Sequence, residues 1–427
     1  MNETELMDEM VRRLGKELKR LLVQVEQGEV PATSLEGILR DRLWHVGSQA
    51  LGVILEALDR QLTSGRRVHD HRTRTVVSLF GPLDVSRSRC RDGQGPCCPL
   101  DEALGLLGQR GWTVGVQETV SLLSCDCGFA TVSDLMGRLF GVGISPPTVQ
   151  QLAESAGQRA EGWLQQRPPG PEDAWQVPDT LIVATDGCQA PQRDGWHEVK
   201  VAALYPKQAR SGGPSGRGKL LRKEYFASLE AVGGFGQALW RRAEGWGVEK
   251  VRRVVVMGDG APWIWNLSEM HFPGAVEIVD FYHAAEHLWA VGEALWGDRH
   301  TSLATRSWVR HYCKSLKEGR VDLVLGAIER RAAQRRGRLP PELAKTVRLN
   351  LEYFRRNAGR MRYGRFRQMG LPIGTGVVEG SCKYVVQSRF KRPGSRWSHY
   401  GLKTMLALKL MRLNQRWEML WPHLAAA

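Results

Sequence analysis

Apolar residues recur every three or four positions from Glu3 to Gln27, and this spacing predicts an amphipathic helix that ends at Gly28. A second helix is expected from Ser34 to Leu62. Two alternating stretches, RTRTVVSLF and LDVSRSR, then follow and are joined at Gly81-Pro82, which predicts a β-hairpin. A helical pair of this kind typically packs against itself or dimerises, so we expect this end of the chain to mediate association.

Helical spacing returns from Gly128 to Phe140, and the short stretch GVGIS separates it from another helix. Ser145 is the expected N-cap of that helix, with Pro146 at its first position. The pattern fits a DNA-binding helix-turn-helix and a plain αα-hairpin equally well. In the first case, the side chains placed to read base edges are Thr148, Gln150 and Gln151.

The second half of the chain begins with a different pattern. The Pro-rich segment RPPGPEDAWQVPD predicts a linker. Five strands are then expected in the stretches LIVATDG, HEVKVAALYP, KEYFASLEAV, VRRVVVMGDG and AVEIVDFYHA. The Gly/Ser-rich segment KQARSGGPSGRGK predicts a loop between the second and third of these. Helices between the later strands indicate a mixed α/β domain, and residues 287–367 look helical throughout.

The composition of the chain indicates what class of partner it binds. Lys and Arg total 60 against 45 Asp and Glu, a formal net charge of +15, which favours a polyanion and excludes an acidic calcium-storage protein. We expect no membrane span and no secretory signal, because no stretch reaches about 20 apolar residues and the first ten residues are acidic. The eight Cys are thinly spread, as in a reducing compartment, so we expect a cytoplasmic, nucleoid-associated bacterial protein.

Three of the cysteines are candidate ligands for a zinc ion. Cys90, Cys97 and Cys98 could form half of a zinc site, but the available second pair, Cys125-x-Cys127, has the wrong spacing for a zinc knuckle. The spacing therefore favours ordinary thiols over a structural zinc.

The candidate chemistry lies in three carboxylates. Asp186 and Asp259 each end an apolar strand and precede a Gly, and Glu379 begins an amphipathic basic helix. A single Asp-Gly is more often a turn or a helix cap. Two such strand ends followed by a Glu in a basic helix instead suggest a site for two Mg²⁺ or Mn²⁺ ions that acts on phosphodiesters. The long gap before Glu379 requires an inserted helical domain.

These segments resemble the DDE transposases of bacterial insertion sequences, most closely the ISKra-type group, which is related to Mutator-like elements. The resemblance is carried by ATDG at Asp186, GDGAPWIW at Asp259, VDFYHAAEHLW from Val279 and GTGVVEGSCKYVVQSRFKRPGSRWS from Gly374. It implies an RNase H-like core with Asp186, Asp259 and Glu379 as catalytic metal ligands. His283 matches the motif's Asp-x-x-His, although a structural histidine is an equal alternative.

The resemblance and the hydrophobic pattern together predict how the chain is divided into domains. We expect a helical association region (1–66), a β-hairpin with the Cys segment (67–110), a helix-turn-helix-like DNA-binding domain (111–166) and a linker (167–179). The RNase H-like mixed-sheet core then follows (180–299). It is interrupted by an all-α insertion (300–370) and completed by the C-terminal catalytic helix and tail (371–427).

The implied activity is a transposase that binds terminal inverted repeats as a dimer or higher oligomer, cleaves DNA and joins the 3′-OH ends to target DNA. The alternatives are a regulatory or domesticated DNA-binding protein and a metal-dependent nuclease without strand transfer. Phosphate and base contacts are expected near Glu379, where basic and aromatic residues follow it. The residues assigned to this contact are Lys383, Arg389, Lys391, Arg392, Arg396 and Trp397.

Overall fold

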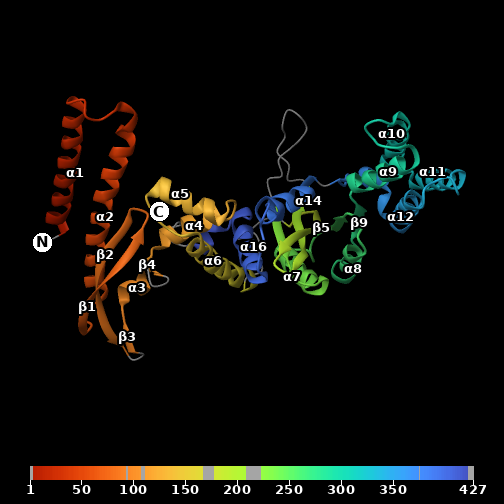
Figure 1. Cartoon of the computed structure of the whole chain (residues 1–427). Helices are drawn as coiled ribbons and strands as arrows, with labels where there is room; N and C mark the ends of the chain where they lie inside the picture. Colours follow the sequence, from red (N-terminus) through yellow and green to blue (C-terminus); the bar gives the residue numbers. More distant parts are fainter. Residues whose placement is uncertain are drawn as a thin grey trace. The chain divides into compact units, whose positions relative to one another are not determined.

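The computed structural model describes residues 3–92, 95–106, 111–166, 177–207, 223–374 and 376–421. They form two compact units, Met1–Ala156 and Gly157–Ala427, which Figure 1 colours along the sequence. The basic loop predicted at 207–219 and most of the predicted linker at 167–179 lie outside the described residues.

The first unit begins with two long helices and a small sheet. Helices α1 (Glu3–Glu26) and α2 (Leu35–Leu62) lie side by side (Figure 1), close to the predicted bounds. Strands β1 (Val68–Ser78), β2 (Gly81–Asp92), β3 (Gly95–Cys97) and β4 (Gly111–Trp112) form a sheet in the order β3-β2-β1-β4.

The predicted hairpin is present, but its turn lies two residues earlier than expected. Ser78 pairs with Gly81, so the turn residues are Leu79 and Phe80 rather than Gly81-Pro82. The Ser78 hydroxyl accepts a hydrogen bond from the Phe80 N–H and donates one to the Gly81 carbonyl, both at 3.1 Å. This local side-chain bonding fixes a turn that the Gly-Pro pair had suggested elsewhere.

Four helices complete the first unit: α3 (Pro99–Ala103), α4 (Val114–Ser124), α5 (Phe129–Phe140) and the start of α6 (Pro146–Gln166). Their core contains the fully buried side chains of Val116, Val132, Met136 and Val149. Ser145 accepts a hydrogen bond from the Thr148 N–H at 3.4 Å, as expected of an N-cap.

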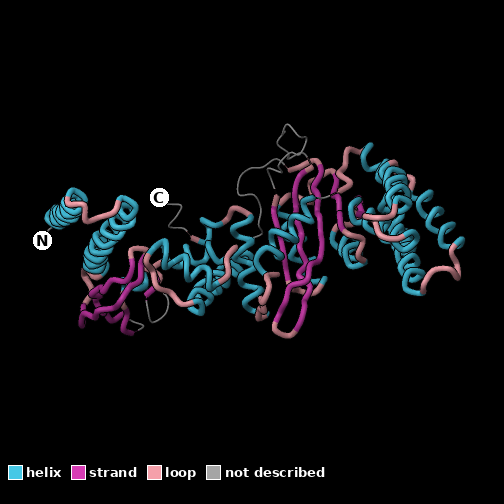
Figure 2. The backbone as a smooth tube through the Cα atoms, turned by 45° about the horizontal axis from the view of Figure 1, so that its top comes forward, coloured by secondary structure: helices cyan, strands magenta, loops and turns pink. Residues whose placement is uncertain are grey.

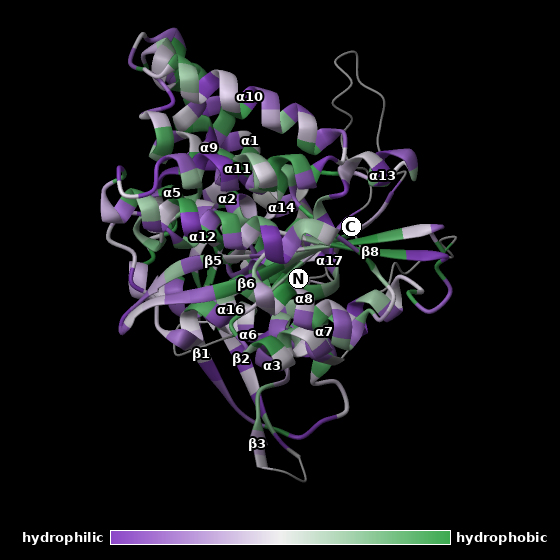
Figure 3. Ribbon diagram, turned by 90° about the vertical axis from the view of Figure 1, so that its right-hand side faces the viewer, coloured by the Kyte–Doolittle hydropathy of each residue, from purple (hydrophilic) through white to green (hydrophobic). Residues whose placement is uncertain are grey.

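The second unit is built on a mixed five-stranded sheet in the order β7-β6-β5-β8-β9. Strand β6 (Gly195–Pro206) pairs antiparallel with both β5 (Thr180–Gln192) and β7 (Glu224–Ser228). Strand β8 (Arg253–Gly258) runs parallel to β5, and β9 (Val276–Val279) runs parallel to β8. Figure 2 shows the β5–β6 hairpin as the longest part of this sheet. Figure 3 shows apolar residues along its inner part and polar residues toward its tip.

Helices α7 (Val232–Gly245) and α8 (Pro262–His271) connect the later strands. An all-helical region follows, as predicted, with α9 (Phe281–Trp296), α10 (Leu303–Lys317), α11 (Val321–Gln334), α12 (Pro341–Asn357) and α13 (Tyr363–Gln368). The chain then returns to the sheet through one helix in three parts: α14 (Gly376–Ser381), a π-helical stretch (Cys382–Gln387) and α15 (Ser388–Phe390). Helices α16 (His399–Leu413) and α17 (Trp417–Leu420) complete the unit.

None of the helices in the described residues is long and apolar enough to cross a membrane.

Candidate active site

The sheet register brings the two predicted aspartates together. The parallel pairing of β5 with β8 runs from Thr180 opposite Arg253 to Ala184 opposite Met257. Asp186, on β5, and Asp259, the residue directly after β8, each lie two positions beyond the last of these pairs, so they follow neighbouring points of the sheet. Strand β5 does not end at Asp186, as the sequence suggested, because it continues as a hairpin with β6 to Gln192. What ends near Asp186 is the pairing with β8.

The pleat of the sheet decides which way Asp186 points. Phe226 of β7 stacks on Phe235 of α7, so this residue faces α7. Ala202 lies opposite Phe226, and the next residue, Val201, lies opposite Asp186. Because successive side chains alternate between faces, Asp186 points away from α7. That face is covered by the helical segment 376–390, whose Cys382 thiol donates a 3.3 Å hydrogen bond to Asp186 Oδ2.

A cleft of about 420 Å³ opens at this end of the sheet. It contains both aspartates together with residues from α9 and from the C-terminal helical segment. Its lining residues are Asp186, Gly258, Asp259, Asp280, Tyr282, His283, Glu286, Cys382, Lys383 and Gln387. A larger cavity of about 650 Å³ lies between α6, α7 and α16, but it does not contain the aspartates.

Burial raises the pKa of Asp186, and the neighbouring charge of Asp259 acts in the same direction. The Cys382 thiol and the Gly187 N–H, at 2.7 Å, donate to this carboxylate, but neither carries a positive charge. The pKa of Cys382 is raised by its hydrogen bond with Cys188 and by burial, so the thiol keeps its proton and remains a donor. A partly buried pair of carboxylates in these surroundings would be stabilised by a hard cation such as Mg²⁺ or Mn²⁺.

The third predicted ligand is placed only by its backbone. Glu379 lies in α14, three residues before Cys382, and α14 packs against β5 and β6. Its side chain lies outside the described residues. Among the side chains that are described, no group of three His, Cys, Asp or Glu residues is arranged to hold a metal ion. Asp186 and Asp259 are the members of the predicted ligand set whose side chains the structure describes, and both line the cleft.

Residues at the start of α9 form another wall of the cleft. Asp280 is buried and caps α9 by accepting a 2.7 Å hydrogen bond from the Tyr282 N–H. The predicted His283 follows in the first turn and lines the cleft. Its electrostatic effect lowers the pKa of Asp186, against the effect of burial.

The helical region also reaches the site, through α12. The Tyr353 hydroxyl donates a 2.6 Å hydrogen bond to the Asp259 carbonyl. Its ring stacks on His287 with centroids 3.5 Å apart, and His287 in turn bonds Asn350 at 2.6 Å. Gly260 has a φ of +102°, and a Cβ there would lie 2.6 Å from the Tyr353 ring. Only glycine therefore fits the close contact between this turn and α12.

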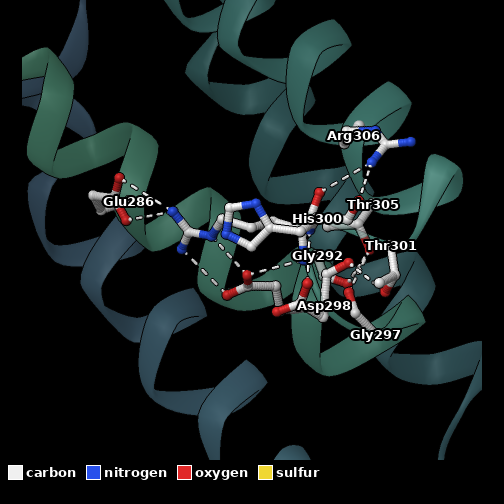
Figure 4. A network of polar contacts seen from close by, with 10 residues as sticks. Glu286, Gly292, Gly297, Asp298, His300, Thr301, Thr305 and Arg306 are labelled. Atoms are coloured by element: carbon white, nitrogen blue, oxygen red, sulfur yellow. Dashed lines mark hydrogen bonds and ion pairs between the residues drawn. The ribbon is translucent and has the colours of Figure 1, made fainter.

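A polar network fixes the far end of α9. Arg299 bonds Glu293 at 2.6 Å and Glu286, on the rim of the cleft, at 3.2 Å. Figure 4 shows this network together with Thr305, which donates to the carbonyls of Gly292 and Gly297. These contacts hold α9 and α10 in a defined turn and keep Glu286 paired.

The predicted DNA-contacting residues near Glu379 divide into two groups. Lys383, Lys391, Arg392 and Arg396 are exposed, and Lys383 lines the cleft. Two others are buried: Trp397 is 7% exposed and Arg389 is 3% exposed. The Trp397 indole donates to the Phe390 carbonyl at 3.2 Å, and the Arg389 guanidinium lies 4.8 Å from its ring. Both pack inside because the chain after α15 folds back onto the hairpin.

The residues predicted to read DNA bases lie in the first unit, whereas the three carboxylates lie in the second. Gln151 is exposed on α6, and Gln150 donates to Glu154 at 2.8 Å. The Thr148 hydroxyl bonds the Ser145 hydroxyl at 2.8 Å. Gln151 is thus the candidate whose side chain is most available to a partner.

The cysteines of the zinc hypothesis lie close together on the first sheet. Cys90 is directly opposite Cys97 on neighbouring strands, and Cys98 caps α3. Burial raises the pKa of Cys98, which disfavours the thiolate that binds a metal.

Sequence reasoning did not assign roles to Cys382, Tyr353 or Asp280. The sequence could have identified Asp280 and Cys382 as site residues, because each lies within three residues of a predicted site residue. Tyr353 had none, since it lies 94 residues from Asp259.

Comparisons with known proteins place the chain in a family. Residues 29–418 match the uncharacterised protein family UPF0236. The chain belongs to this family. It is 24% identical to the UPF0236 protein in the vanSb 3′ region of Streptococcus gallolyticus, over 93% of this chain and 88% of that protein. A comparison of structures finds the Drosophila P element transposase strand transfer complex at 12% identity and a TM-score of 0.26, covering 72% of this chain and 80% of that one.

Proposed function

We propose that this UPF0236 protein is a metal-dependent DNA transposase of the DDE type, with an RNase H-like core in its second unit. The observation that carries the proposal is that Asp186 on β5 and Asp259, directly after the adjacent parallel strand β8, line one cleft. The antiparallel arrangement of β5, β6 and β7, followed by two parallel strands, supports the RNase H-like assignment.

The residues of the chain have separable roles in this proposal. Asp186 and Asp259, with Glu379, would hold Mg²⁺ or Mn²⁺. Bound divalent ions supply the activation of an attacking oxygen and the stabilisation of the leaving 3′ oxygen. Lys383 lines the cleft and would neutralise the DNA phosphate. The Cys382 thiol orients Asp186, and Tyr353 fixes the backbone of Asp259.

The test is incubation of the full chain with labelled DNA from both flanks of its own gene, with and without Mg²⁺. We expect metal-dependent strand cleavage and joining of the freed 3′-OH to a second duplex. Asp186→Asn, Asp259→Asn and Glu379→Gln should each abolish both reactions, because each removes an anionic ligand with little change in shape. Near-wild-type cleavage by one variant would remove that residue from the triad.

The same experiment separates the other functions. Cleavage without joining would identify a nuclease. Sequence-specific binding without any cleavage would identify a regulatory DNA-binding protein. A binding readout independent of cleavage is thermal unfolding, where excess Mg²⁺ should stabilise the wild type, by about 2.7 kcal/mol at a hundredfold excess over Kd, and stabilise the three variants less.

A further inference from the structure

The tip of the β5–β6 hairpin carries an exposed tryptophan. Trp196 is 59% exposed, whereas every other tryptophan among the described residues is buried or half-buried. It lies directly opposite Pro191, next to the turn between the two strands. A single exposed apolar side chain is common on protein surfaces, so the neighbours of Trp196 decide what its position means.

The same tip is held against the basic segment that follows the catalytic helix. The Arg193 N–H donates to the Trp397 carbonyl at 3.0 Å, and the Trp397 N–H donates to the Pro191 carbonyl at 3.2 Å. The Lys391 ammonium lies 5.4 Å from the centroid of the Trp196 ring. The buried Trp397 therefore anchors the hairpin, and the exposed Trp196 stands among cations.

Charge at the tip is strongly one-sided. The exposed basic residues are Arg193, Lys391, Arg392 and Arg396. The acidic side chains there are Asp194, which pairs with His197 at 3.0 Å, and Glu198, which pairs with Lys200 at 3.1 Å. Exposed cations beside an exposed aromatic ring form the combination that binds single-stranded nucleic acid, where phosphates meet the charges and a base stacks on the ring.

The helical segment 376–390 connects this tip to the cleft. It begins beside Asp186 and ends at the tip, and Lys383 and Gln387 line the cleft on the way. Pro191 follows Asp186 by five residues on β5, which is about 17 Å along an extended strand. A single strand whose phosphate lies at the cleft could therefore reach the tip within a few nucleotides.

We propose that the hairpin tip is a contact site for unpaired DNA, with Trp196 stacking on a base a few nucleotides from the phosphate that cations bound by Asp186 and Asp259 would hold. Lys391 and Arg392 bind the neighbouring phosphates. The position of the contacted base relative to a cut rests on the proposed function, whereas the binding site itself does not.

Binding is tested first, on the full chain carrying Asp259→Asn so that no cleavage occurs, with a single-stranded 30-nucleotide DNA of arbitrary sequence. Trp196→Ala should weaken binding by about tenfold or more without changing the salt dependence, and Trp196→Phe should retain most of the affinity. Lys391→Ala should lower the salt slope by about one. The matched controls are Met270→Ala, which removes a side chain that is 71% exposed on α8, and Lys250→Ala. Unchanged binding by Trp196→Ala, or an equal loss in Met270→Ala, would overturn the proposal.

The position is tested with the fluorescent base 2-aminopurine, placed singly at each of ten positions from the cut on DNA from the gene flanks. Quenching that is greatest at one position a few nucleotides from the cut and lost in Trp196→Ala is the expected result. Quenching near the cut itself, independent of Trp196, would refute the assigned spacing. If the wild type cuts no DNA but Trp196→Ala still weakens single-strand binding, the proposed transposase activity fails and the tip site stands.

Discussion

Asp186 is an aspartate whose surroundings disfavour its charge. Burial and the neighbouring Asp259 raise its pKa, and its hydrogen bonds with Cys382 and Gly187 only partly oppose this. A side chain that opposes folding when ionised is retained where its charge is used. At the residue scale, the site therefore combines a cost in stability with the capacity to attract a cation.

Asp186→Asn should increase the free energy of unfolding at pH 7.5 in the absence of divalent metal. A carboxyl whose folded pKa lies above its unfolded pKa contributes stability below the unfolded value and loses it as pH rises through the folded value. The difference in the free energy of unfolding between Asp186→Asn and the wild type should therefore become smaller as the pH is lowered toward the acid range. Urea unfolding of both proteins at several pH values measures this, with the exposed Glu249→Gln as control. A constant gap across pH would show that the ionisation of Asp186 is not responsible.

Cys382→Ala should raise the Mg²⁺ concentration needed for half-maximal cleavage by about 10–100-fold, which is the usual effect of removing a group that orients a metal ligand. The reason is loss of the thiol donor to Asp186 Oδ2. Cys382→Ser supplies a hydroxyl donor at the same place and should restore much of the response. The readout is the Mg²⁺ concentration for half-maximal cleavage, and equal behaviour of the two variants would limit Cys382 to a packing role.

At the scale of elements, α12 matters because it contacts the turn after β8. The inserted helices are thus not a separate appendage, since the Tyr353 hydroxyl bonds the Asp259 carbonyl directly. The π-helical stretch Cys382–Gln387 plays a comparable part on the other side, as it contains both Cys382 and Lys383. Such stretches often occur at functional sites.

Tyr353→Phe should reduce the free energy of unfolding by about 0.5–1.5 kcal/mol, the net value of one hydrogen bond, and should lower cleavage more than that loss explains. Stacking on His287 would remain, so the effect isolates the hydroxyl. The control is Tyr400→Phe, which removes a hydroxyl contact with Gln158 away from the aspartates. Cleavage lowered equally in both variants would argue against a role for α12 in placing Asp259.

At the scale of the whole molecule, the helices α1 and α2 carry apolar side chains that no core covers. Val11 is 63% exposed, Leu22 is 58% exposed and Ile54 is 55% exposed. An exposed apolar stripe of this kind is typical of a surface that associates with another chain.

Leu22→Glu should shift the protein to a lower sedimentation coefficient, because a charge on the apolar stripe opposes association. Arg12→Glu changes charge on the same helix and serves as control. The same sedimentation coefficient for wild type and Leu22→Glu would show that α1 does not mediate association.

The two units should divide DNA recognition, because base contacts specify and phosphate contacts position. Gln151→Ala in the first unit should reduce discrimination between terminal-repeat and random DNA by roughly 1–3 kcal/mol. Arg392→Ala in the second unit should weaken binding to both DNAs alike and flatten the salt slope by about one. Filter binding over a series of salt concentrations distinguishes the two effects. Loss of specificity in Arg392→Ala together with loss of only general affinity in Gln151→Ala would show that the roles of the two units are exchanged.

Much of the architecture followed from the sequence. The periodicity of 3.6 located α1, α2 and α5, and alternation located the hairpin of the first sheet and the strands of the second, because these signals arise between residues only a few positions apart. The mixed α/β class was confirmed. The RNase H-like assignment, the domain bounds and the catalytic roles remain predictions.

The sequence alone selected Asp186 and Asp259, since apolar strands that end in carboxylates are a local pattern. Only the tertiary structure decided which tryptophan is exposed: Trp397 is buried and Trp196 is not, because the chain after α15 packs onto a hairpin that lies about 200 residues earlier in the sequence. It also decided that Cys382 meets Asp186 and that Tyr353 meets Asp259. Burial and hydrogen bonding at these positions depend on partners distant in the chain, and no local pattern of residues encodes them.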